Sequence, residues 1–369
     1  MSLTATPRKA PQRDAAPTVE NALTAGMLPR FTSLWVLIGC LAATSAFFAI
    51  LAAANGGEFS IVGAVFFGVV LYAIVIWVLS RIIEGRRKAA DRFVTALVAT
   101  AFTIALLPLI SVTWTTVVNG LPRFDLQFFS QSMRNVVGAG GGALHAIVGT
   151  LLITGMAALI SVPVGLLTAI YLVEYGRGRL KHGITFFVDV MTGIPSIVAG
   201  LFAFALFALI TGDPGYRSGF AGSIALSVLM IPVVVRSSEE MLRLVPNELR
   251  EASFALGVPK WLTIVKVVLP TSIAGIVTGV MLSIARVIGE TAPLLIVAGF
   301  TTSMNYNLFS ERMMTLPVFV YTQYMNQGTD TQAYIDRAWA GALTLILIVA
   351  ILNVIARIVA KVFSPKFGR

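Results

Sequence analysis

Long apolar runs separated by short polar stretches dominate the chain from residue 34 onward. Each run can supply the roughly 20 helical residues needed to cross a hydrocarbon core about 30 Å thick. We expect helices, because lipid offers backbone groups no partners and the runs are too long for barrel strands. The pattern predicts eight membrane spans, at residues 34–54, 59–80, 93–118, 144–173, 185–211, 218–236, 270–298 and 338–362.

The composition agrees with this pattern, because only 12% of the 369 residues are charged and 57% are apolar. A soluble domain cannot cover so much apolar surface, so the sequence predicts an all-α integral membrane protein. Residues 1–33 are polar and have no periodic apolar face, which predicts a disordered cytoplasmic tail. This polar lead is too long for a signal peptide, so we expect the first span to be retained.

The basic residues predict the orientation. If the N-terminus is cytoplasmic, 21 of the 27 lysines and arginines lie on the cytoplasmic side. Such an excess is the positive-inside signal, so we expect both termini in the cytoplasm. The net charge of +10 is therefore a topology signal rather than a nucleic-acid patch. The five basic residues expected outside are Arg123, Arg134, Arg217, Arg312 and Arg337.

Catalytic and metal chemistry have little support in the sequence. There is one cysteine, Cys40, and the two histidines, His145 and His182, lie far apart, so we predict no metal site. No G-x-x-x-x-G-K-[ST] phosphate loop occurs, so this chain should not bind ATP in that way. The glycine-rich run 138–142 lacks the required lysine, and we interpret it as a flexible linker within an extracytoplasmic loop, 119–143.

The cytoplasmic loop 237–269 contains two short helical pieces. Pro246 marks the start of the first piece, and Gly257 with Pro259 marks its end. Gly257 can adopt the left-handed conformation that redirects the chain toward the second piece. A short helix–turn–helix with apolar positions suits docking into a groove on a soluble partner.

This loop resembles the EAA loop of ABC importer permeases, whose pattern is E-A-A, three residues, G, nine residues, I-x-L-P. In this sequence Ser253 stands where the pattern has its second alanine, and Val267 stands where it has isoleucine. The alternative interpretation of the loop is an ordinary interfacial helix. The resemblance implies that ATP and Mg are bound by a separate ATPase subunit. The positions implied to contact that ATPase are Glu251, Ala252, Gly257, Leu269 and Pro270.

Three further stretches, at 193–202, 286–293 and 338–343, resemble the PstA family of phosphate permeases. The resemblance implies a type I ABC importer (MetI-like) core of five spans in residues 144–363, in a bacterial plasma (inner) membrane. It also implies a PstC-like permease, two copies of a PstB-like ATPase and a PstS-like phosphate-binding protein as partners. Family members have one span before the core, whereas this chain has three predicted spans within 34–118. The resemblance therefore implies that the first two, within 34–80, are additional.

Arg286 is the basic residue placed well inside a span, and Glu290 follows four residues later. This spacing predicts that both lie on one helical face and pair. Charges inside a membrane are functional by default, and a guanidinium fork matches phosphate oxygens. A purely structural ion pair is the alternative. The expected substrate pathway comprises Arg286, Glu290, Pro195 at a kink, Ser196 beside it and Arg236 at the exit.

The resemblance therefore implies inward phosphate transport by alternating access, and we predict no catalytic site in this chain. A permease for another oxyanion, molybdate or sulfate, is the nearest alternative. An ion-coupled secondary carrier would leave the cytoplasmic loop motif unexplained, and a non-transporting membrane scaffold or sensor is a third possibility.

Overall fold

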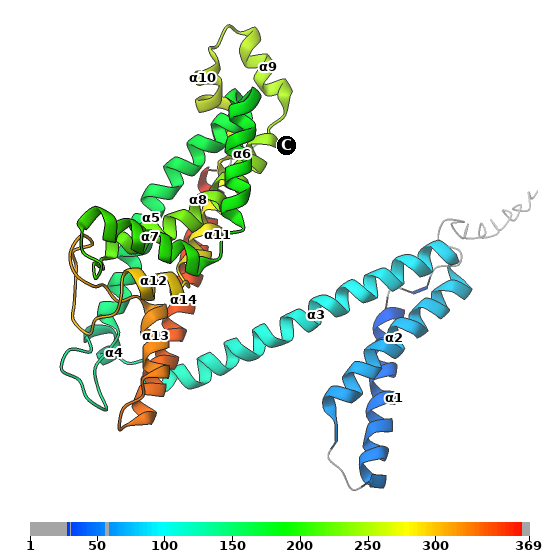
Figure 1. The fold of residues 1–369 in the computed structure, drawn as a ribbon. Helices are drawn as coiled ribbons and strands as arrows, with labels where there is room; N and C mark the ends of the chain where they lie inside the picture. Colours follow the sequence, from blue (N-terminus) through cyan, green and yellow to red (C-terminus); the bar gives the residue numbers. More distant parts are fainter. Residues whose placement is uncertain (1–27, 30, 56–58, 364–369) are drawn as a thin grey trace, which may run out of the picture. The chain divides into compact units, whose positions relative to one another are not determined.

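Figure 1 shows the computed structural model of the chain, in which residues 28–29, 31–55 and 59–363 are described. These residues form helices and loops, with no strand among them. Seven helices in the described part are long and apolar enough to cross a membrane, or up to eight if one bent pair counts as a single span. The all-α membrane fold is confirmed. The expected tail at 1–33 lies mostly outside the described residues.

The helices differ from the predicted spans mainly where a span is broken. Their bounds are α1 Thr32–Asn55, α2 Ile61–Ile83, α3 Arg86–Gly120, α4 Leu126–Ser130, α5 Leu144–Ile170, α6 Gly178–Thr192, α7 Ser196–Thr211, α8 Gly219–Arg243, α9 Asn247–Ala255, α10 Lys260–Thr263, α11 Leu269–Val287, α12 Ala292–Val297, α13 Leu316–Met325 and α14 Thr331–Phe363. A short 3-10 turn, Leu121–Arg123, follows α3, and π-helical turns occupy Tyr171–Tyr175 and Ile264–Val268.

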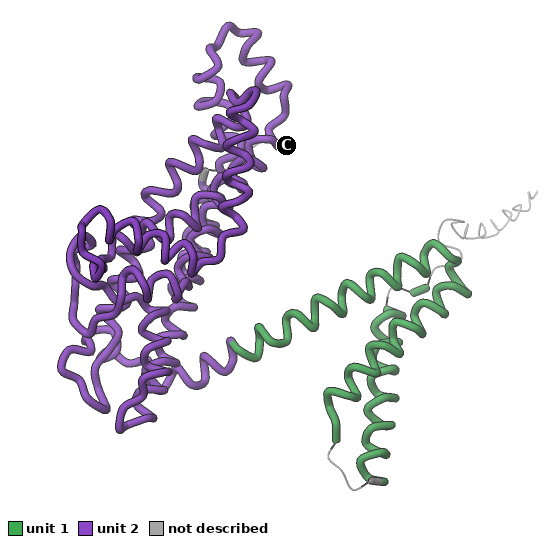
Figure 2. Tube along the Cα trace, viewed as in Figure 1, with its two compact units in different colours: residues 1–112 green, residues 113–369 purple. Residues whose placement is uncertain are grey.

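The chain divides into two units, residues 1–112 and 113–369, with the boundary inside α3 (Figure 2). In the first unit, α1 and α2 pack closely where Gly68 leaves no room for a side chain. A Cβ at Gly68 would lie 2.7 Å from the Leu41 side chain and 2.7 Å from Thr44 Oγ1. Small residues that allow helices to approach are typical of membrane packing.

An ion pair stabilises the turn between α2 and α3. Arg92 donates to both carboxylate oxygens of Glu84, at 2.5 and 2.8 Å, and Ser80 Oγ donates to the same carboxylate at 2.7 Å. These bonds, chiefly the one from Arg92, lower the pKa of Glu84 to about 2. The lowered pKa of Glu84 stabilises the fold at pH values above 4.5, the ordinary pKa of this group. This stabilisation is lost as the pH falls toward 2. The turn is therefore insensitive to pH near neutrality.

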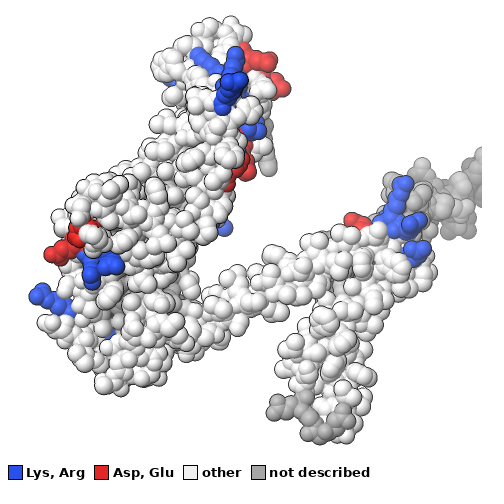
Figure 3. Space-filling model, in the orientation of Figure 1, with Lys and Arg blue, Asp and Glu red and all other residues white. Residues whose placement is uncertain are grey.

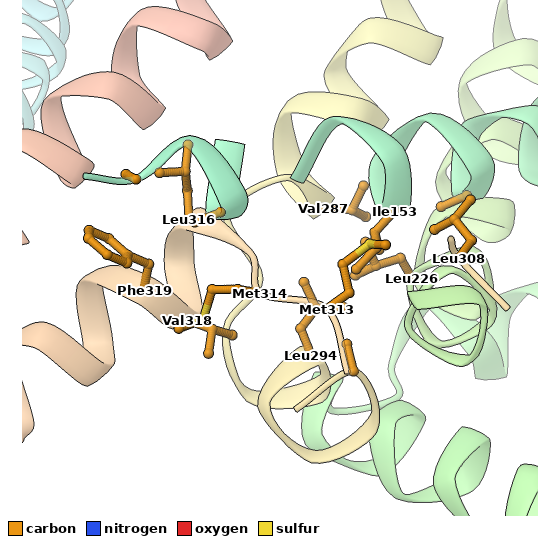
Figure 4. Close-up of a cluster of buried hydrophobic side chains, with 14 of the residues drawn as sticks. Ile153, Leu226, Val287, Leu294, Leu308, Met313, Met314, Leu316, Val318 and Phe319 are labelled. Atoms are coloured by element: carbon orange, nitrogen blue, oxygen red, sulfur yellow. The ribbon is translucent and has the colours of Figure 1, made fainter. Parts of the chain in front are cut away.

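In the second unit, α5 and α8 form the centre of the core. Ser223 Oγ donates to Ile153 O at 3.1 Å, which satisfies a buried hydroxyl across the two helices. Further along, a Cβ at Gly165 would lie 2.7 Å from Val234 Cγ1, so the helices approach closely there. Apolar side chains from α5, α8, α11, α12, α13 and the loop before α13 complete the core; those labelled in Figure 4 include Ile153, Leu226, Val287, Leu294, Met313 and Phe319.

Two glycines of α5 provide a matched test of this packing. A Cβ at Gly149 would lie 1.9 Å from the carbonyl oxygen of Met314, whereas one at Gly155 would meet nothing within 4 Å. We expect Gly149→Ala to lower stability by about 3 kcal/mol, because overpacking against backbone forces a shift. Gly155→Ala should be neutral or stabilising by up to about 1 kcal/mol, because alanine favours the helix. Thermal unfolding of the purified protein measures both, and equal effects would contradict this account.

Candidate transport site and coupling surface

The span predicted at 185–211 is not one helix. The chain bends by 108° between α6 and α7. Pro195 precedes the first residue of α7, and its ψ of 138° takes the chain out of the helical region. Proline lacks the backbone N–H and so favours a kink or a break where it interrupts a helical segment. The kink expected at Pro195 is therefore a complete break, with the partly buried Ser196 beginning the new helix.

The span predicted at 270–298 is broken as well. Helix α11 ends at Val287, and the short helix α12 begins at Ala292. Arg286 lies in the last turn of α11, whereas Glu290 lies in the connection, where its N–H donates to Val287 O at 3.1 Å. The prediction that Arg286 and Glu290 share one helical face is wrong, because the helix stops between them.

These two breaks bring distant parts of the sequence together. Helices α7 and α12 pack against each other and against α8. At their contact, a Cβ on Gly200 would lie 2.7 Å from Pro293 Cα, so only glycine fits there. The stretches 193–202 and 286–293, singled out separately in the sequence, thus form one packed region.

Arg286 and Glu290 remain available charges within this region. Arg286 is exposed and Glu290 is half-buried. Among the described residues, neither forms an ion pair with the other or with a third group. A guanidinium in this position is free to meet an anion or a charge on a neighbouring subunit.

Arg236 is held differently. Its guanidinium donates to Glu239, one turn along α8, at 2.8 Å and also pairs with Asp189 on α6. Arg243 pairs with the same Glu239 at 2.5 Å. The spacing of Arg236, Glu239 and Arg243 on one helix could have been recognised in the sequence. Asp189 could not, because it is 47 residues away from Arg236.

The loop predicted to be cytoplasmic contains the two helical pieces expected, α9 and α10. Gly257 has a φ of +76°, so the predicted left-handed turn between them is confirmed. Leu269 and Pro270 begin α11, which continues directly from the second piece. Glu251 and Ala252 lie exposed on α9.

One side of this loop is apolar and exposed. Phe254, Leu256 and Trp261 have 44%, 83% and 61% of their surface accessible. On the other side, Ser253 and Thr263 are buried and their hydroxyls are hydrogen-bonded at 2.9 Å, which joins α9 to α10. We call the exposed side, formed by Glu251, Ala252, Phe254, Leu256 and Trp261, the coupling surface.

Arg250 fixes this loop to the end of α5 and was not singled out in the sequence. Its Nε donates to Glu174 Oε1 at 3.0 Å, and its terminal nitrogens donate to the carbonyls of Val245 at 2.6 Å and Leu242 at 2.9 Å. Lys260 adds a bond to the carbonyl of Glu174. These contacts attach the loop to the ends of α5 and α8.

If this loop docks onto an ATPase, as its EAA-like motif implies, Arg250→Met should lower transport about fivefold while ATP hydrolysis continues. Breaking a largely buried ion pair leaves Glu174 uncompensated and costs about 3–5 kcal/mol locally. Parallel measurements of uptake and ATP hydrolysis in vesicles test this. Arg179→Met, which removes an exposed arginine on α6, is the control and should have no effect. Unchanged coupling in Arg250→Met would show that Arg250 does not transmit motion.

The glycine-rich run 138–142 is not a free linker. Arg337 donates to the carbonyls of Gly138 and Gly140 at 2.7 and 3.0 Å, and Arg123 donates to that of Gly141 at 2.6 Å. Arg337 was expected in an outside loop, but it lies within α14 and is fully buried. The expectation of flexibility is wrong, because arginines distant in the sequence hold the run.

A comparison with known protein families bears on this arrangement. The family described as "Binding-protein-dependent transport system inner membrane component" matches residues 161–369, which include the coupling loop and both helix breaks. The chain belongs to this family. The ABC importer permease fold expected from the EAA-like loop is thereby confirmed, and the chain is a multi-pass membrane subunit of that class.

Individual relatives within this permease family are similar over most of their length. The "Phosphate transport system permease protein PstA 1" of Mycobacterium tuberculosis is 46% identical over 284 residues, covering 76% of this chain and 92% of the relative. Proteins named PstA from Mycobacterium leprae and Yersinia pestis are 47% and 37% identical, each covering 75% of this chain and 90% and 92% of the relative. About a quarter of this chain thus lies outside the region aligned with these relatives.

Proposed function

We propose that this chain is the permease subunit that carries inorganic phosphate inward in an ATP-driven importer. The observation that carries the proposal is the 46% identity to a phosphate permease over 92% of that relative. The packing of the 193–202 and 286–293 stretches against each other supports it, because the residues behind the phosphate-permease resemblance meet in one region.

The proposed complex contains a PstC-like permease, two PstB-like ATPase subunits that bind ATP and Mg, and a PstS-like phosphate-binding protein. We place the complex in a bacterial inner membrane, with both termini of this chain in the cytoplasm. The excess of basic residues near one membrane face supports this orientation. The exposed apolar coupling surface then faces the cytoplasm, where an ATPase groove can receive it.

In the proposed mechanism, closure of the ATPase pair on ATP moves α9 and α10. Because Arg250 joins this loop to α5, the movement reaches the core helices and alternates access to the pathway. Arg286, Glu290, Pro195 and Ser196 contribute to the substrate pathway at the two helix breaks. Arg236 guides phosphate toward the cytoplasm only if its pairs with Asp189 and Glu239 open.

The four-component complex, purified and reconstituted in vesicles, tests the proposal. Phosphate-loaded binding protein should stimulate ATP hydrolysis and drive phosphate accumulation, whereas the sulfate and molybdate forms should not. Stimulation by sulfate or molybdate would instead identify a permease for another oxyanion. Phosphate accumulation by this chain alone, driven by an ion gradient, would contradict the ATP-driven mechanism.

A further inference from the structure

The second unit contains a cavity of about 510 Å³ that the proposed pathway does not include. It lies between the α7–α8 connection and the loop that follows α12. Residues lining it include Tyr216, Arg217, Thr301, Glu311 and Arg312. Figure 3 shows charged side chains gathered toward the two ends of this unit, with few between them. The predicted orientation places the cavity on the extracytoplasmic side, at the opposite end of α8 from the coupling surface.

Two arginines converge at this cavity. Gly299, which follows α12, has a φ of +74°, and a Cβ there would lie 2.9 Å from Arg217 Cδ and 3.2 Å from Arg312 Cδ. The stems of both arginines therefore pass over the same backbone position. Because Gly299 has no side chain, there is room for the stems of these two arginines, 95 residues apart in the sequence, to lie side by side.

Both guanidinium groups retain unused donors. Arg217 donates from Nε to Ile296 O at 2.9 Å, and its guanidinium carbon lies 5.8 Å from the centre of the Phe204 ring; the described residues accept no hydrogen bond from its terminal nitrogens. Arg312 is exposed, and no hydrogen bond or ion pair of its side chain occurs in the described part of the chain. Two adjacent forked cations with free terminal N–H groups match the geometry of an oxyanion.

The walls of the cavity are held in place by contacts between the two loops. Tyr216 donates to Phe309 O at 3.0 Å, and the N–H of Phe220 donates to Leu308 O at 2.6 Å. The rings of Phe220 and Phe309 lie 4.8 Å apart. An anion meeting the two arginines therefore encounters a site that is already formed.

We propose that Arg217 and Arg312 form an outer capture site that holds phosphate briefly between its release by the binding protein and its entry to the pathway. The proposal rests on the proposed function. Helix α12, roughly 9 Å long at 1.5 Å per residue, separates Gly299 from the break that contains Glu290. Asp213 and Glu311 also line the cavity, so its formal charge is balanced and the anion is held weakly enough to leave.

A binding measurement on the wild-type complex tests the site directly. Phenylglyoxal modifies accessible guanidinium groups, and peptide mass spectrometry can follow Arg217 and Arg312 separately. Inorganic phosphate should slow modification of both about tenfold in the detergent-solubilised complex, and Arg134, exposed in another loop, should be unaffected. Absence of protection would overturn the proposal. Protection in lipid vesicles before any phosphate is added would assign the site to lipid headgroups and also overturn it.

A transport measurement separates capture of phosphate from docking of the binding protein. Arg312→Gln, which removes no hydrogen bond or ion pair among the described residues, should lower maximal uptake about tenfold, the equivalent of one lost charge-assisted contact, without changing the half-saturating concentration of loaded binding protein. Arg134→Gln is the matched control and should behave as wild type. A raised half-saturating concentration with unchanged maximal uptake would show that Arg312 binds carboxylates of the binding protein instead. Lack of phosphate uptake by the wild-type complex would refute the proposed function rather than this site.

Discussion

Replacing Gly257 with valine should lower phosphate uptake at least tenfold, while the protein stays inserted in the membrane. Gly257 has a φ of +76°, and nothing lies within 4 Å of the position of a Cβ. A side chain would therefore be strained by the backbone alone. The left-handed conformation costs an ordinary L-residue about 1–2 kcal/mol, and a β-branched residue is less tolerant still. Relief of this strain would re-aim α10 relative to α9 and disrupt the coupling surface.

Asparagine provides the matched control at this position, because it adopts the left-handed conformation more readily than other residues with a side chain. Gly257→Asn should keep most of the uptake. Simultaneous measurement of ATP hydrolysis and phosphate uptake in vesicles separates lost coupling from lost assembly. Normal uptake in Gly257→Val would show that the angle between α9 and α10 is unimportant for coupling.

Arg286→Gln should also lower phosphate uptake at least tenfold. Glutamine preserves much of the length and some donors but removes the charge that an anion would meet. Arg286 is exposed and forms no ion pair among the described residues, so its removal should not destabilise this subunit. Arg357→Gln, at another exposed arginine on a long helix, is the control and should transport normally.

A double variant separates the substrate role from a structural role in the complex. If Arg286 and Glu290 pair only with each other or with a neighbouring subunit, Arg286→Gln with Glu290→Gln should recover transport, because both charges are gone. If Arg286 contacts phosphate, the double variant should assemble and stay inactive. Phosphate uptake near the wild-type rate in the double variant would defeat the substrate-contact interpretation.

The helix breaks show where sequence reasoning reached its limit. Hydropathy placed 185–211 and 270–298 in apolar segments. Because hydropathy is averaged over many residues, it cannot locate a turn inside an apolar segment. Pro195 gave a local signal for the first break. The second break, after Val287, has a weaker signal in Gly289, and the apolar residues on both sides of it conceal the turn.

The sequence by itself determined the membrane class, the positions of most spans and the two-piece loop that contains Gly257. These depend on local properties: the length of an apolar run, the conformational freedom of Gly257 and the spacing of a short motif. Only the tertiary structure decided which charges meet. Arg250 with Glu174, Arg236 with Asp189, and Arg217 beside Arg312 are each separated by many residues, and packing of the intervening helices sets their distances. Arg337 is the clearest case, because its burial against the carbonyls of Gly138 and Gly140 gives no signal in a linear reading of the chain.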